Sequence, residues 1–153
     1  MDGQVRSRSA PSLADFGWMG QLSQLAVDPT PYDLIRGEFP FTMRWLANLD
    51  DASGVEGEWR DPDAPLTSAV SGLLKHAGEI YFPFLLANAE AVAKGAATFS
   101  TILLGRTYTQ GAFKYQAKCL AELRNAFARL DAEAKRKITP LLDDAGCLKP
   151  LGG

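Results

Sequence analysis

The sequence has little of the chemistry on which most enzymes rely, beginning with histidine. His76 is the only histidine among 153 residues, and it follows Lys75 in the middle of a predicted helix. A hydrolase triad would need this histidine as the general base, close to a nucleophile and an orienting acid. No nucleophile-elbow sequence is present to supply the nucleophile. We therefore expect no self-contained catalytic site, and we interpret His76 as a surface or half-buried helical residue.

Cysteine is equally scarce, because the chain has only Cys119 and Cys147. A disulfide scaffold needs more cysteine in a shorter chain, whereas two lone thiols are typical of a reducing compartment. Together with His76 they lack the short ligand spacings of a zinc site. The acidic loop over residues 51–65 lacks the alternating pattern that binds calcium. We predict no metal site, and we expect both cysteines to pack as small apolar residues.

The chain also lacks a strong charge of one sign and a long apolar run. Its formal net charge of -2 gives no reason to expect nucleic acid, which usually meets a basic face. The basic triplets at 6–8 and 135–137 are interpreted as solvated surface. No segment reaches the roughly 18 consecutive apolar residues of a membrane span, and the N-terminus has no apolar signal-peptide run. Neither glycine-rich phosphate-binding fingerprint is present. We expect a cytoplasmic protein that binds neither nucleic acid nor membrane.

What the chain does have is helical periodicity, which begins after a polar leader over residues 1–11 that we expect to be disordered. Ser12 stands three residues before Asp15. This spacing is typical of a capping box, in which the two side chains each accept a hydrogen bond from a free backbone N–H of the first turn. The sequence therefore predicts a helix from Leu13 to Ala26 that begins at a structural capping box.

This first helix is unusually apolar, with no charged residue between Phe16 and Val27. A helix that is apolar all round is typical of a buried position. Gly17 and Gly20 lie one turn apart, and glycine is costly inside a helix. We therefore expect a neighbouring helix to pack closely against these two glycines.

The rest of the chain also reads as mainly helical. Further helices are predicted over residues 40–49, 67–94 (with a kink at Pro83), 112–130 and 131–142. The helix over 112–130 carries an apolar stripe made of Tyr115, Leu120, Leu123, Phe127 and Leu130. Residues 97–109 are instead rich in β-branched and aromatic types around a Gly105–Arg106 pair, which predicts a small hairpin with glycine first in a type II′ turn.

An aromatic group offers the one candidate for a ligand site. Tyr81, Phe84 and Tyr115 could line an apolar pocket between helices, together with Phe82 and Trp59. Aromatic residues at helical spacing are also typical of an ordinary core, so both interpretations stay open at this point.

Three segments carry a resemblance to a known family. Residues 12–17 resemble the start of the sixth helix of glutathione transferases, where a Ser/Thr-x-x-Asp box opens a buried helix. Residues 39–46 are similar to the next helix of that fold, with a proline followed by a tryptophan, and residues 113–120 resemble the C-terminal region of a bacterial branch. The segments occur in the family's order and span residues 11 to about 150.

The resemblance implies a mainly α fold, a bundle like the glutathione transferase C-terminal domain over residues 12–146. A small β-hairpin near 97–109 and a flexible tail over 147–153 would complete it. A complete enzyme of this family also has a thioredoxin-like domain that binds glutathione and activates its thiol, and this chain has no segment for it. No catalytic or cofactor-binding residue carries over. Only Ser12 and Asp15 do, with a structural role.

Two classes of function follow. The first is a truncated, noncatalytic helical module that acts in interactions or binds an apolar ligand. The second is part of an active glutathione transferase whose thioredoxin-like half lies on another chain or is missing, in which case glutathione would be a substrate. In the family the fourth and fifth helices lie beside the apolar helix, and they are absent here. We therefore expect a homo-oligomer, or a partner chain that covers the Leu13–Ala26 helix.

Overall fold

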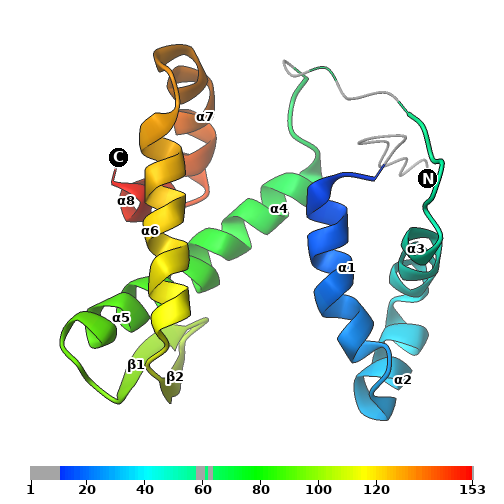
Figure 1. Ribbon diagram of the computed structural model, residues 1–153, viewed down its shortest axis with the longest axis horizontal. Helices are drawn as coiled ribbons and strands as arrows, with labels where there is room; N and C mark the ends of the chain where they lie inside the picture. The colour runs from blue at the N-terminus through cyan, green and yellow to red at the C-terminus, as the bar shows by residue number, and fades with distance from the viewer. Residues whose placement is uncertain (1–10, 58–60, 62–63, 153) are drawn as a thin grey trace. The chain divides into compact units, whose positions relative to one another are not determined.

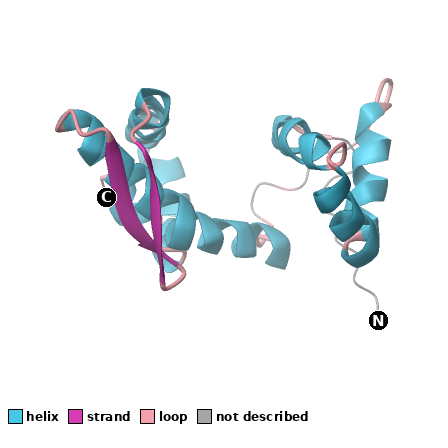
Figure 2. Cartoon of the chain, turned by 90° about the horizontal axis from the view of Figure 1, so that it is seen from below, coloured by secondary structure: helices cyan, strands magenta, loops and turns pink. Residues whose placement is uncertain are grey.

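The computed structural model describes residues 11–57, 61 and 64–152, which form a mainly helical protein with a small two-stranded antiparallel sheet (Figures 1 and 2). The expected mainly α class and the small hairpin are confirmed. The chain divides into two compact units, Met1–Pro65 and Leu66–Gly153, and each is described by itself. The residues of the single domain predicted over 12–146 fall in both units. That domain stays a prediction. The predicted leader lies outside the described residues except for Pro11.

The N-terminal unit is built from helices that follow one another closely. They are α1 (Leu13–Leu25), α2 (Pro29–Glu38) and α3 (Pro40–Asp50). Helix α2 begins where the Asp28 carboxylate accepts a hydrogen bond from the Thr30 N–H at 3.0 Å, a standard N-cap. Helix α3 packs against both α1 and α2, and the buried side chains of these helices are Ile35, Leu46 and Leu49.

The C-terminal unit starts with the long helix predicted over 67–94, which the structure divides into consecutive segments. They are α4 (Ser68–His76), the π-helix η1 (Ala77–Tyr81) and α5 (Phe82–Ala93). Thr67 caps the start through its hydroxyl, which accepts from the Val70 N–H at 3.3 Å. The predicted irregularity is thus a wider π turn just before Pro83. Because Pro83 has no N–H, the Glu79 carbonyl cannot receive the usual α-helical bond, and the Phe82 N–H donates to Ala77 five residues back.

A hairpin follows, made of β1 (Thr98–Leu103) and β2 (Arg106–Gly111). Its turn differs from the prediction. Leu103 pairs with Arg106, so the loop is Leu104–Gly105, with glycine second. Both loop residues have positive φ, 49° and 76°, as a type I′ turn requires and a type II′ turn does not. Type I′ turns match the twist of the strands well, and here this preference prevails over the strain of a left-handed Leu104.

The chain ends in three helices, α6 (Lys114–Arg129), α7 (Ala132–Asp144) and α8 (Leu148–Leu151). The Asp131 carboxylate accepts from the Ala134 N–H at 2.8 Å and so caps α7, as predicted. The flexible tail expected over 147–153 instead contains α8. Leu148 and Leu151 pack against the core, and the Arg124 Nε donates to the Pro150 carbonyl at 2.8 Å. These contacts explain why this segment is ordered into a helix.

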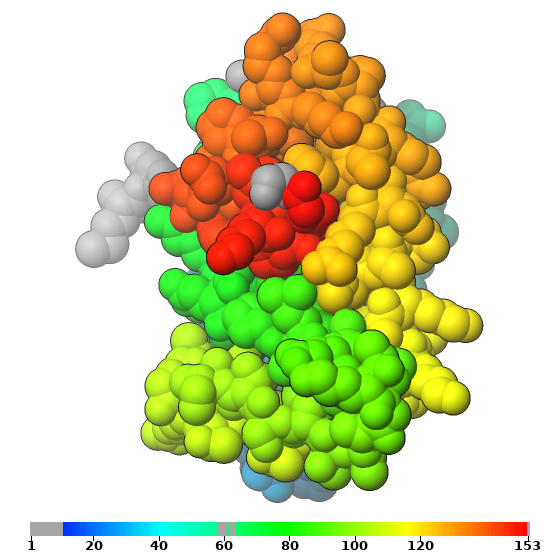
Figure 3. Space-filling view, turned by 90° about the vertical axis from the view of Figure 1, so that its left-hand side faces the viewer, coloured from blue at the N-terminus to red at the C-terminus, as the bar shows by residue number. Residues whose placement is uncertain are grey.

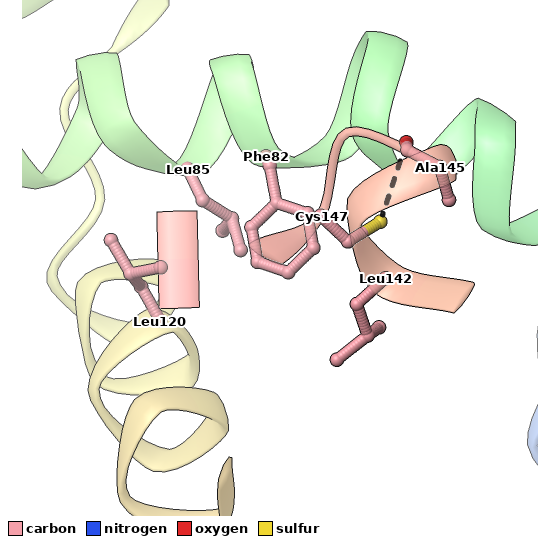
Figure 4. Close-up of a cluster of buried hydrophobic side chains, with 6 residues drawn as sticks. All are labelled: Phe82, Leu85, Leu120, Leu142, Ala145 and Cys147. Atoms are coloured by element: carbon pink, nitrogen blue, oxygen red, sulfur yellow. Dashed lines mark hydrogen bonds between the residues drawn. The ribbon is translucent and has the colours of Figure 1, made fainter. Parts of the chain in front are cut away.

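The core of the C-terminal unit lies where α5, α6 and the end of α7 meet (Figure 4). Its buried side chains are Phe82, Leu85, Leu120, Leu142, Ala145 and Cys147. Leu120 was in the predicted apolar stripe of its helix, and Cys147 packs as a small apolar residue, as expected. The core therefore joins the middle of the unit to its C-terminal end.

A buried asparagine ties this core to the hairpin. The Asn88 side chain is fully buried, its amide donates to the Phe113 carbonyl at 2.9 Å, and its oxygen accepts from the Phe113 N–H at 2.8 Å. One side chain on α5 thus satisfies both backbone groups of the residue that precedes α6. This pairing fixes where the hairpin ends and α6 begins.

The backbone at Gly78, inside η1, lies very close to the backbone at the end of α7. A Cβ atom at this position would clash with the Ala145 carbonyl oxygen and lie 3.2 Å from the Gly146 carbonyl carbon. By contrast, a Cβ at Gly17 or Gly20 would meet nothing within 4 Å. The close helix packing expected at those two glycines is therefore not found there.

Candidate binding site

An apolar pocket of about 380 Å³ lies in the C-terminal unit, next to the core shown in Figure 4. Every helical segment of the unit contributes to its wall. The lining residues are Leu74, Ala77, Tyr81, Phe82, Leu123, Ala126, Phe127, Leu130, Ile138, Leu142, Cys147 and Leu151. Figure 3 shows the C-terminal unit from one side, where segments of α6, α7 and α8 lie together. We call this site the apolar pocket.

The wall of the apolar pocket is almost wholly carbon. Only Tyr81 and Cys147 among its lining residues have a polar side-chain atom. The Cys147 thiol donates to the Leu74 carbonyl at 3.3 Å, and burial raises its pKa. Burial also raises the pKa of Tyr81, with smaller contributions from Cys119 and Tyr115 nearby. Both groups are therefore neutral near pH 7, and the pocket wall carries no charge.

Of the five aromatic residues predicted to line a pocket, Phe82 lines the apolar pocket and Trp59 lies outside the described residues. The other three are placed differently from one another. Tyr81 lines the apolar pocket. Tyr115 is 66% exposed and is not a lining residue, although it lies near enough to affect Tyr81. Phe84 packs against the hairpin, with its ring 5.3 Å from that of Phe99 and 6.0 Å from that of Tyr108. The structure thus brings Tyr81 and Tyr115 together and leaves Phe84 on the hairpin side.

Most of the wall was not proposed as a site from the sequence. Leu123, Phe127 and Leu130 belong to the predicted apolar stripe of α6, but apart from Tyr115 that stripe was not proposed as a ligand site. The signal that could have found them is the length of the stripe. It runs past Leu120, which belongs to the core, toward the end of α6, where Leu123, Phe127 and Leu130 line the apolar pocket.

The residues considered for catalysis or metal binding do not converge. The His76 side chain is 68% exposed, and its Nδ1 lies 3.9 Å from the Glu79 Oε2 in an exposed i,i+3 pair. Cys119 is half-buried and Cys147 is buried in the core. Over the described ranges, no cluster of three or more His, Cys, Asp or Glu could hold a metal ion. No helix among the same residues is long and apolar enough to cross a membrane.

Ser12 and Asp15 form the predicted capping box at the start of α1. The Asp15 carboxylate accepts from the Ser12 N–H at 2.8 Å and from the Ser12 hydroxyl at 2.6 Å. Ser12 is buried, so this carboxylate satisfies polar groups that are largely shielded from water.

Helix α1 itself differs from the expected buried helix. None of its side chains is buried, Leu13 is 89% exposed and Trp18 is 50% exposed. Within its unit, α1 packs against α3.

Comparisons of the chain with protein-family models, with curated proteins and with solved structures find no match. The resemblance to glutathione transferases therefore depends on the three segments quoted above, and it stays a prediction.

Proposed function

We propose that the chain is a helical module, similar to the C-terminal domain of glutathione transferases, that binds an apolar ligand and has no catalysis of its own. The observation that carries the proposal is the apolar pocket. Its volume of about 380 Å³ falls in the range of small-molecule sites, and its wall is apolar and uncharged. The proposed module would therefore hold its ligand by the hydrophobic effect.

The apolar pocket retains surface that a ligand could cover. Leu123 is 37% exposed, Ile138 is 36% exposed and Tyr81 is 44% exposed. Full burial of such a side chain is worth about 1.5–3 kcal/mol, so covering the exposed third of each contributes roughly 0.5–1 kcal/mol. Covering these three side chains contributes roughly 1.5–3 kcal/mol in total, to which the burial of the ligand's own apolar surface adds.

The direct test is fluorescence titration with diphenylhexatriene, a neutral hydrocarbon that emits strongly in apolar surroundings. Ala126 lies on the pocket wall and is exposed, so Ala126→Phe should fill the pocket without disturbing the core. Ala121 is an exposed alanine on the same helix but is not a lining residue, which makes Ala121→Phe the matched control. Binding by wild type and Ala121→Phe, but not by Ala126→Phe, is expected. Equal binding by all three proteins would contradict a pocket-based function.

The second candidate is part of an active glutathione transferase. The observation that favours it is the Ser12–Asp15 capping box, because a box of this type opens a helix in the resembling family. Glutathione and the catalytic group would then depend on a thioredoxin-like domain supplied by another chain. A glutathione-affinity pull-down and a conjugation assay with chlorodinitrobenzene separate the two candidates. We expect the chain alone to show neither retention nor turnover, and measurable turnover would overturn the noncatalytic proposal.

The apolar surface of α1 supports the expected association. Leu13, Phe16 and Trp18 are all exposed, and apolar surface of this kind is typical of interaction sites. A homo-oligomer, or a partner chain over the Leu13–Ala26 helix, would cover it. Analytical ultracentrifugation tests the first possibility, and a monomer at high micromolar concentration would count against it.

A further inference from the structure

The polar groups around the apolar pocket are already used within the chain. The Cys147 thiol is directed to the Leu74 carbonyl, with the Ala145 carbonyl 3.7 Å away (Figure 4), and the Cys147 N–H donates to the Leu142 carbonyl at 2.7 Å. Tyr81 contributes its ring, since the pocket surface is almost wholly carbon. No donor or acceptor of the described lining residues is therefore offered to a ligand.

The charge at the edge of the pocket is also engaged. The Lys135 Nζ lies 5.8 Å from the ring centre of Phe127, a lining residue, but it donates a hydrogen bond to the Ala128 carbonyl at 2.9 Å. Small-molecule sites usually contain a few polar groups that orient the ligand. Because the described lining residues offer no such polar group, only a ligand without hydrogen-bonding groups gains free energy by entering the pocket.

The volume sets the size of that ligand. A dry apolar cavity of about 150 Å³ takes one benzene molecule. On that scale the apolar pocket, at about 380 Å³, has room for a group of two to three fused rings or an aliphatic group of equal size.

We propose that the apolar pocket selects a neutral hydrocarbon group of this size and discriminates against ligands that place a hydrogen-bonding group inside it. This inference rests on the proposed function and specifies its ligand class. A carbonyl or carboxylate that enters the pocket loses its hydrogen bonds to water and finds no donor in exchange.

The test uses isosteric probes in competition with diphenylhexatriene on the full chain. 2-Isopropenylnaphthalene and 2-acetylnaphthalene have nearly the same shape, because a CH2 group replaces the ketone oxygen, and only the second has an acceptor. We expect the ketone to bind at least about tenfold more weakly than the hydrocarbon. 2-Naphthoate, added as a third probe, examines whether Lys135 can leave Ala128 to hold an anion, and we expect it to bind more weakly than the hydrocarbon.

The outcomes separate the two proposals. Failure of the wild-type chain to bind either diphenylhexatriene or 2-isopropenylnaphthalene would overturn the proposed function and the ligand class with it. Binding that Ala126→Phe abolishes, but with the ketone or naphthoate as tight as the hydrocarbon, would overturn the ligand class alone. The inference is supported if the hydrocarbon binds at least about tenfold more tightly than the ketone and also more tightly than naphthoate.

Discussion

Replacement of Gly78 by alanine is the sharpest test of how the C-terminal unit is packed. The new methyl group would clash with the Ala145 carbonyl oxygen and also come within 3.0 Å of the Ala145 carbonyl carbon. These are backbone atoms, so no side chain can rotate away to make room. Relief requires the end of α7 and η1 to separate by at least about 1 Å, since apolar contacts are optimal near 3.5–4.0 Å.

The size of the effect follows from two opposing contributions. Overpacking a close contact costs about 1–3 kcal/mol, and a contact between two backbones belongs at the upper end. Alanine recovers about 1 kcal/mol relative to glycine in a helix. We therefore expect a net loss of about 2 kcal/mol in the free energy of unfolding, or about 1 M in the urea midpoint for an m-value near 2 kcal/mol/M.

The measurement should follow the C-terminal unit. All three tryptophans, Trp18, Trp45 and Trp59, belong to the N-terminal unit, so far-UV circular dichroism is the more suitable signal. Gly72→Ala is the matched control, because Gly72 lies in the preceding helix α4 with open space around its Cβ position. We expect this control to gain about 0.5–1 kcal/mol. A Gly78→Ala variant as stable as the Gly72→Ala variant would refute the close approach of η1 and α7.

Three further predictions concern polar groups. Asp15→Ala should lower the stability of the N-terminal unit by about 0.5–2 kcal/mol, because the Ser12 N–H and hydroxyl lose their acceptor; an unchanged denaturation midpoint in tryptophan fluorescence would show that the capping box contributes nothing. Asn88→Ala should cost roughly 2–4 kcal/mol by leaving both backbone groups of Phe113 unpaired. Asn88→Asp should be more stable near pH 4 than near pH 7 relative to wild type, since only a protonated carboxyl can donate to the Phe113 carbonyl; a flat pH dependence would contradict this pairing. Burial raises the pKa of Cys147 in the folded state, so the stability that its neutral thiol contributes is complete below the unfolded pKa of about 8.5 and falls as the pH rises above it. Unfolding measured between about pH 8 and pH 10 should show a shallower decline in Cys147→Ala than in wild type, and identical slopes would refute it.

Local rules predicted the elements well where the decisive signal lay within a few residues. The capping box at Ser12 and the Asp131 cap depend on a side chain and a backbone N–H three residues apart. The hairpin followed from the β-branched composition of residues 97–109. The type of the hairpin turn was not predicted correctly. In the Leu104–Gly105 loop the leucine adopts a strained left-handed backbone, which a rule based on the position of glycine does not anticipate.

The sequence was less informative about which surfaces meet. It directed attention to Gly17 and Gly20, whereas the glycine in closest contact is Gly78. A glycine in a helix shows only that a side chain is missing, and the neighbour that needs the space comes from the far end of the chain. Most of the apolar pocket was missed for the same reason, although Tyr81 and Phe82 were named as possible lining residues. The stripe on α6 predicts an apolar face, but whether α7 and α8 fill that face or leave a gap depends on their lengths and angles.

The π turn at Ala77–Tyr81 has a consequence for where this chain tolerates deletions in evolution. A π turn holds one residue more than the α-helical turn it replaces, so it marks a place where chain length, as well as residue identity, determines the structure. Loss of a single residue between Gly78 and Phe82 would convert the π turn into an ordinary α-helical turn and keep Leu85 and Asn88 on the core face of α5. Loss of Phe84, inside the regular α-helix, would instead rotate Leu85 and Asn88 by about 100° about the helix axis. Deletion of an exposed residue such as Glu79 should therefore be tolerated better than deletion of Phe84.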